Sequence, residues 1–106
     1  MILTVMFDEQ MYDLDVPDKF IIDSQDFYEK MDSDMDKGWQ VSREWIDNPD
    51  PRQRCQIVAD KILSAFHDED ERGVLLMAGY ILSRATDVKK VSIDTSGDIT
   101  LTEFSA

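Results

Sequence analysis

An uninterrupted apolar run occupies residues 74–82, nine positions without a charged side chain. A helix that is apolar on all sides must be covered on more than one side. The run therefore predicts a core helix over residues 69–85, with Asp68 as its N-terminal cap and Glu71 three residues later. Gly79 lies inside this helix, where the lack of a side chain would let another backbone segment come close.

An amphipathic helix is predicted to precede the core helix. Asp50 is a favourable N-terminal cap, Pro51 suits the first helical position, and Gln53 completes a capping box. Polar residues 67–71 separate the two helices. The apolar residues of this helix recur at helical spacing and form one buried stripe: Cys55, Val58, Ala59, Ile62, Ala65 and Phe66.

Apolar and polar residues alternate in two segments near the N-terminus, on either side of the polar residues 8–10. A period of two is typical of half-buried strands, so the pattern predicts a β-hairpin that ends at Pro17. The inward positions are Leu3, Val5 and Phe7 in the first strand and Tyr12, Leu14 and Val16 in the second.

Residues 89–104 predict a second hairpin. A three-residue loop over residues 95–97, with Gly97 in the left-handed conformation, would pair Val91 with Leu101 and Ile93 with Ile99. This register places four aliphatic side chains on one face, so the turn chemistry and the alternation agree.

The segment that follows the N-terminal hairpin is ambiguous. Apolar residues at spacings of three and four predict a helix over residues 24–37, with Asp23 or Ser24 as its cap. A start at Asp18 is the alternative, and residues 20–22 also suit a short strand.

Residues 39–45 predict one extended middle strand, which the proline-rich segment 47–51 ends. The resulting order predicts an α+β fold, in which an antiparallel sheet of the N- and C-terminal hairpins plus the middle strand packs against about three helices. A chain of 106 residues is expected to form a single domain, residues 1–106.

The formal net charge is −12, and residues 1–50 carry most of it, with 14 acidic against 4 basic side chains. Such a field disfavours direct binding to nucleic acids or anionic membranes, and it favours a protein partner with a basic surface. The single cysteine excludes an intramolecular disulfide, and the first residues lack the basic segment of a signal peptide. We therefore expect a cytoplasmic protein.

Neither a catalytic centre nor a cofactor is expected. His67 is the only histidine and would lie roughly 18 Å along a helix from Cys55. Arg52 and Arg54 are of the kind that lowers a nearby thiol pKa, but Cys55 belongs to the apolar stripe, so we expect it in the core.

Asp32, Asp34 and Asp36 alternate in a pattern similar to the start of a calcium loop. The positions that require glycine and glutamate in such a loop hold Lys37 and Arg43, so we assign no metal site here. A divalent-cation-binding module that uses these three carboxylates is an alternative hypothesis.

The favoured hypothesis is a small acidic, non-enzymatic module that binds a basic surface of another protein. Tryptophan and arginine dominate binding hot spots, and the middle strand would carry them on one face beside the acidic cluster. The predicted partner-binding residues are Asp32, Asp34, Asp36, Trp39, Arg43 and Trp45. A DNA mimic that inhibits a DNA-binding protein is a further alternative, and a homodimer through the two tryptophans is compatible with each hypothesis.

Overall fold

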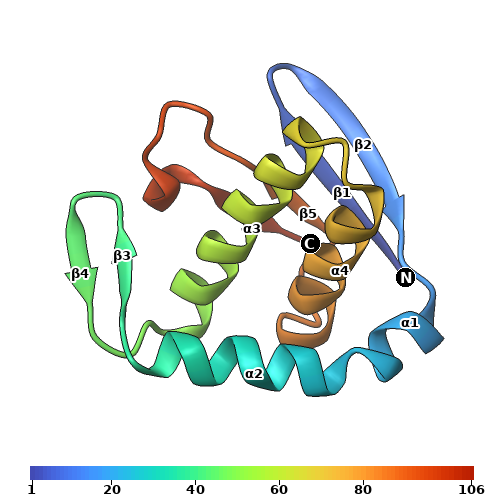
Figure 1. Cartoon of the computed structure of the whole chain (residues 1–106). Helices are drawn as coiled ribbons and strands as arrows, with labels where there is room; N and C mark the ends of the chain where they lie inside the picture. The colour runs from blue at the N-terminus through green and yellow to red at the C-terminus, as the bar shows by residue number, and fades with distance from the viewer.

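The two ends of the chain together form one four-stranded sheet, ordered β2-β1-β5-β6, in a computed structural model that describes residues 1–106. Its strands are β1 (Ile2–Phe7), β2 (Gln10–Asp15), β5 (Lys90–Ser92) and β6 (Glu103–Ser105). The two longest helices lie against one face of this sheet (Figure 1). The α+β prediction is therefore confirmed, but the predicted antiparallel sheet is mixed, because β1 and β5 are parallel. A parallel pair of this kind needs a long crossover, which the helices provide.

The N-terminal hairpin has the predicted alternation. Leu3 pairs with Leu14 and Val5 with Tyr12, and these side chains face the helices. Asp8 and Glu9 form the two-residue turn with φ values of 52° and 63°. Two consecutive left-handed residues match the twist of a hairpin, so the register is set by the turn as well as by the apolar face.

The ambiguous segment contains two helices, α1 (Asp18–Asp23) and α2 (Gln25–Asp36). They meet at Ser24, whose amide donates to carbonyls of the last turn of α1. The predicted helix over residues 24–37 thus corresponds to α2, and the alternative start at Asp18 is also occupied by helix. Ser24 occupies the cap position of α2 without a side-chain hydrogen bond to the helix.

The two longest helices are α3 (Pro51–His67) and α4 (Glu71–Arg84). The capping box that Asp50 and Gln53 form at the start of α3 is as predicted. The cap of α4 is Asp70, which accepts a hydrogen bond of 2.9 Å from the Gly73 amide, and the prediction of Asp68 was wrong. The reason is that α3 extends to residue 67, so Asp68 ends that helix instead of beginning the next.

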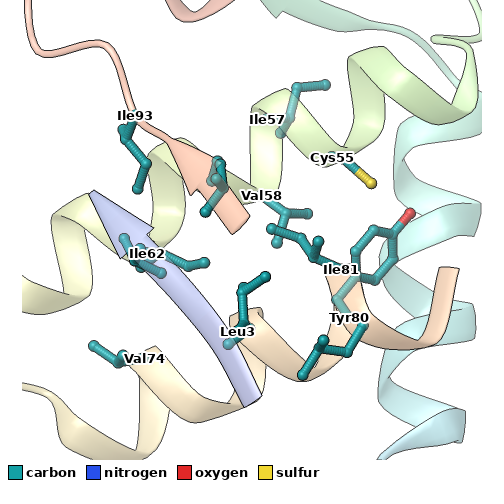
Figure 2. Close-up of a cluster of buried hydrophobic side chains, with 14 of the residues drawn as sticks. Leu3, Cys55, Ile57, Val58, Ile62, Val74, Tyr80, Ile81 and Ile93 are labelled. Carbon is teal, nitrogen blue, oxygen red and sulfur yellow. The ribbon is translucent and has the colours of Figure 1, made fainter. Parts of the chain in front are cut away.

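The core lies between the sheet, α3 and α4 (Figure 2). Leu3 of β1, Val58 of α3 and Ile81 of α4 are fully buried there. The core helix is covered from a second side by α2, because the Tyr28 hydroxyl donates a hydrogen bond of 2.8 Å to the Leu76 carbonyl oxygen. At Gly79 it is this tyrosine hydroxyl, and not another backbone, that occupies the space a side chain would need.

The predicted middle strand is in fact a hairpin. Trp39, Arg43 and Trp45, which were predicted to share one face of a single strand, therefore lie in different parts of this hairpin. It consists of β3 (Trp39–Val41) and β4 (Glu44–Ile46), which form a separate two-stranded sheet. Ser42 turns the chain with a φ of 55°, followed by Arg43. The turn contains neither glycine nor asparagine, and the alternation through it is unbroken, so the pattern could not distinguish one strand from two.

The register of the C-terminal hairpin was also predicted wrongly. Val91 pairs with Phe104, three residues beyond the predicted partner Leu101, which is exposed. The buried amide of Gln56 explains the shift, since its nitrogen donates to the carbonyl oxygens of Thr100 and Thr102 at 3.2 and 3.1 Å. A short 3-10 helix, η1 (Ile99–Leu101), brings these carbonyls to α3. The left-handed glycine at the tip of the loop is as predicted.

Candidate functional site

Asp32, the first residue of the predicted acidic cluster, is engaged within the protein. Its carboxylate accepts hydrogen bonds from the hydroxyl of Tyr80, from Arg84 Nε at 3.0 Å and from Arg54 Nη1 at 3.3 Å. These partners lie on α3 and α4, whereas Asp32 lies on α2. The carboxylate therefore attaches α2 to the two core helices.

Arg54 extends this attachment to Asp36 and to the turn before α3. Its Nη2 donates to Asp36 Oδ1 at 2.6 Å and to Asn48 Oδ1 at 2.8 Å, and its Nε donates to the Pro49 carbonyl oxygen. Only 14% of the Arg54 side chain is exposed. Because a desolvated guanidinium is retained only when it is paired, Arg54 requires these acceptors.

The electrostatics of this cluster follow from its geometry. Burial raises the pKa of Asp32, but the hydrogen bonds from Tyr80 and Arg84 and the charge of Arg84 outweigh it, so the pKa lies below its ordinary value. Burial and the neighbouring Asp32 carboxylate raise the pKa of Tyr80. Asp32 is therefore charged and Tyr80 neutral at neutral pH. A cleft of about 580 Å³ opens beside these residues, but the charges in its wall already neutralise one another.

Asp34 is the one member of the acidic cluster that faces solvent without a partner. It is exposed and takes part in no ion pair or side-chain hydrogen bond. The structure contains no group of three or more His, Cys, Asp or Glu side chains arranged to hold a metal ion. The cation hypothesis would require Asp32 and Asp36 to leave their arginines, and the geometry lends it no support.

The two tryptophans face different surroundings, because the hairpin places Trp39 opposite Ile46 and Trp45 opposite Gln40. Trp39 is half-buried against the core, and the Lys61 ammonium lies 5.0 Å from its ring centroid. Trp45 is 59% exposed. The single face that was predicted to carry both indoles does not exist, because the two indoles lie on opposite faces of the hairpin.

Trp45 is exposed but held in place. Its ring lies against Gly38, where a Cβ atom would be only 2.6 Å from the indole. Its Nε1 donates a hydrogen bond of 2.9 Å to Asp47 Oδ1. Gly38 follows the C-terminal end of α2, so the indole lies beside the acidic end of that helix. We call Trp45 and Asp47, together with the adjoining Gly38 at the end of α2, the Trp45 surface. Arg43 lies in the turn between β3 and β4, is exposed, and forms no ion pair.

A groove with an apolar floor and an acidic rim was not predicted from the sequence. It has a volume of about 600 Å³ and lies between β2, the end of α3 and the start of α4. We call it the β2 groove; its floor is Leu14, Ala65, Phe66, Val74 and Leu75, and its rim is Glu69, Asp70 and Glu71. The acidic rim corresponds in the sequence to the run of acids between the two apolar helices. The sequence pattern predicted helix caps at these positions and not the rim of a groove.

No protein-family model, curated protein or solved structure matches this chain. No helix has the length and apolar character that a membrane crossing requires.

Cys55 lies in the core, as predicted. Burial and the charge of Asp32 raise the pKa of its thiol to about 11, in spite of the nearby arginine. At pH 8 such a thiol has ~100-fold less thiolate than an ordinary cysteine. We therefore expect iodoacetamide to alkylate the folded protein at least ~100-fold more slowly than the protein in 6 M guanidinium chloride. Comparable rates in the two states would show that the thiol is accessible and reactive.

Proposed function

We propose that this protein is a non-enzymatic module that binds a basic surface of another protein, with the Trp45 surface as its contact. The observation that carries the proposal is the exposed indole of Trp45, which is hydrogen-bonded to the acidic Asp47 and packs on Gly38. Rigid aromatic residues bind at a low cost in conformational entropy and are frequent hot spots. An indole held by Asp47 and Gly38 is already in one conformation before a partner arrives.

The distribution of charge supports a basic partner. Of the 23 acidic residues, five form ion pairs, namely Asp15, Asp18, Asp23, Asp32 and Asp36. Arg54 and Arg84 form ion pairs with Asp32 and Asp36. Their positive charges therefore do not neutralise the other acidic side chains on the surface. A field of this sign raises the association rate with basic surfaces and repels a second copy of the chain.

The chemistry of the interior supports a binding role over a catalytic one. The thiol of Cys55 is buried and its pKa is raised, which opposes nucleophilic activity. The polar cluster around Asp32 is internally neutralised, so it offers no unpaired acid or base to a substrate. We also propose that the protein acts in the cytoplasm, since its single free cysteine suits a reducing compartment.

Capture from a lysate of the producing cells tests this proposal. The immobilised protein is expected to retain proteins with basic surfaces and to release them as sodium chloride rises from about 50 to 500 mM. Trp45→Ala should weaken binding of the purified captured protein about 30-fold, as expected for a hot spot. Phe27→Ala is the matched control, because Phe27 is a partly exposed aromatic residue of α2 outside the Trp45 surface.

The control variant is expected to bind within about threefold of the original protein, as most contacts outside a hot spot do. Retained proteins that are acidic or neutral would contradict the proposal. So would binding that is insensitive to salt, or an equal loss of affinity in the Trp45 and Phe27 variants.

A further inference from the structure

The strand β2 is an edge of the main sheet, and half of its backbone polar groups have no partner. In Figure 1 it is the outermost strand, on the opposite side of the molecule from the β3–β4 hairpin. The Val16 amide donates to the Met1 carbonyl oxygen at 2.7 Å, so even-numbered residues of β2 face β1. The N–H and C=O groups of Met11, Asp13 and Asp15 therefore point outward along a free edge.

The β2 groove continues directly from this edge on the helical side of the sheet. Leu14 is inward-facing in β2 and forms part of the groove floor. The Phe66 ring, another part of the floor, lies 5.0 Å from the ring of Tyr12 and 5.3 Å from that of Phe7. These aromatic contacts hold the floor in place, so the groove is formed without a ligand. A strand added to β2 would direct alternate side chains into it.

The charged side chains of β2 and of the groove are all acidic, and the one positive group beside the edge is the Met1 ammonium, 3.8 Å from Asp15 Oδ1. Glu69, Asp70 and Glu71 form the rim, and no lysine or arginine lines the groove. On the other face of the sheet, Asp13 and Asp15 project from β2 into solvent. Acidic residues on an edge strand prevent two like strands from pairing. They would make favourable cross-strand pairs with basic side chains.

We propose that β2 and the β2 groove bind an extended peptide segment of a partner protein, in which apolar and basic residues alternate, as a fifth strand of the sheet. Its backbone pairs with the free groups of Met11, Asp13 and Asp15. Its apolar side chains enter the groove, and its basic side chains meet Asp13 and Asp15 on the opposite face. This mode of recognition combines main-chain hydrogen bonds for affinity with alternate side-chain contacts for specificity.

A second copy of this chain is the less suitable occupant. Two β2 edges would bring the carboxylates of Asp13 and Asp15 against their own counterparts, and each chain carries a net charge of −12. The inference rests on the proposed function only in its choice of a basic partner. It uses a surface that shares no residue with the Trp45 surface.

The probe is an eight-residue peptide of alternating lysine and valine with blocked ends. Hydrogen exchange measured by NMR is expected to show at least tenfold slower exchange of the Met11, Asp13 and Asp15 amides when the peptide is bound. The amides of Tyr12 and Leu14 already face β1 and should change little. A peptide of the same composition with four lysines followed by four valines should bind at least tenfold more weakly, as should the alternating peptide of glutamate and valine.

Three variants test the edge and the groove separately. Asp13→Pro removes an outward N–H without breaking the ladder to β1, since proline is tolerated at such edge positions. This variant should lower the affinity for the alternating lysine–valine peptide at least tenfold. Asp13→Asn keeps the N–H and loses only the charge, so about a threefold effect is expected. Leu75→Lys places a base in the groove and should also weaken binding at least tenfold. Circular dichroism checks that each variant is folded.

Unchanged exchange of the three outward amides in the saturated protein would overturn the inference, whatever the variants do. Equal binding of the alternating and block peptides would overturn it as well. Trp45→Ala should leave the peptide affinity unchanged. If Trp45→Ala abolishes capture from the lysate while the peptide still slows exchange of the β2 amides, both proposals stand. If the peptide slows exchange of the β2 amides but capture is unaffected by Trp45→Ala and by salt, the proposed function alone fails.

Discussion

Replacing Asp32 with alanine is expected to lower the free energy of unfolding by about 3 kcal/mol. The substitution removes the acceptor of three hydrogen bonds, from Tyr80, Arg84 and Arg54. It leaves two partly buried guanidinium groups without their shared counter-charge. Because 26% of the Asp32 side chain is exposed, water can replace part of the lost interaction, and the effect should lie at the lower end of the range for buried ion pairs.

Asp34→Ala is the matched control for this prediction. It removes the same charge from the same helix, two residues away, but Asp34 is exposed and unpaired. A change of less than about 0.5 kcal/mol is expected. Urea unfolding of both variants measures the difference, and equal effects would mean that the cluster does not attach α2 to the core helices.

The same carboxylate predicts how stability depends on pH. The pKa of Asp32 is lower in the folded protein than its value of about 3.9 in the unfolded chain. Its contribution is therefore complete above that unfolded value and is lost as the pH falls through the folded value. Below about pH 4 the original protein should lose stability more steeply than Asp32→Asn. Parallel pH profiles would contradict the assignment.

Replacing Gly79 with alanine is expected to lower the free energy of unfolding by about 2 kcal/mol. On an exposed helix this change would stabilise by about 1 kcal/mol. Here the new methyl group would collide with the Tyr28 hydroxyl. Tyr28 has no room to move, since it is fully buried and its ring packs edge-on against Tyr80 with centroids 5.8 Å apart.

The variant Tyr28→Phe separates this collision from other effects. It removes the hydroxyl and should itself cost about 1 kcal/mol, the typical contribution of one hydrogen bond. In that background Gly79→Ala should be neutral or mildly stabilising, which gives a coupling energy of about 2 kcal/mol in a double-mutant cycle. Additive losses would show that the tyrosine hydroxyl is not what Gly79 accommodates.

Local patterns predicted the elements of this protein better than their pairing. The N-terminal hairpin and the cap of α3 follow from residues adjacent in sequence, where alternation and turn chemistry act over a few positions. The register of β5 and β6 depends instead on Gln56, which is more than 40 residues distant from the carbonyls it binds. The exposure of Leu101 also has a local cause that alternation does not include, because the Asp98 carboxylate accepts a hydrogen bond of 3.0 Å from the Thr100 amide and caps η1.

The candidate site shows the same division. The acids at the end of α2 were recognised as unusual, but the arginines that bind Asp32 and Asp36 lie on other helices. Proximity of this kind arises from packing. Trp45 could be singled out by residue type, whereas its exposure depends on the turn at Ser42, which resembles a continuing strand in the sequence.

The parallel pairing of β1 with β5 also determines when the protein can assemble. Thr4 pairs with Lys90 and Met6 with Ser92, so the centre of the sheet joins segments from opposite ends of the chain. Contacts of such large sequence separation form slowly, while α3 and α4 are neighbours in sequence and can pack early. During synthesis the edge of β1 that pairs with β5 therefore stays unpaired until β5 has left the ribosome. A nascent chain that stalls before this point would present a helical pair with an uncovered apolar face to chaperones and proteases.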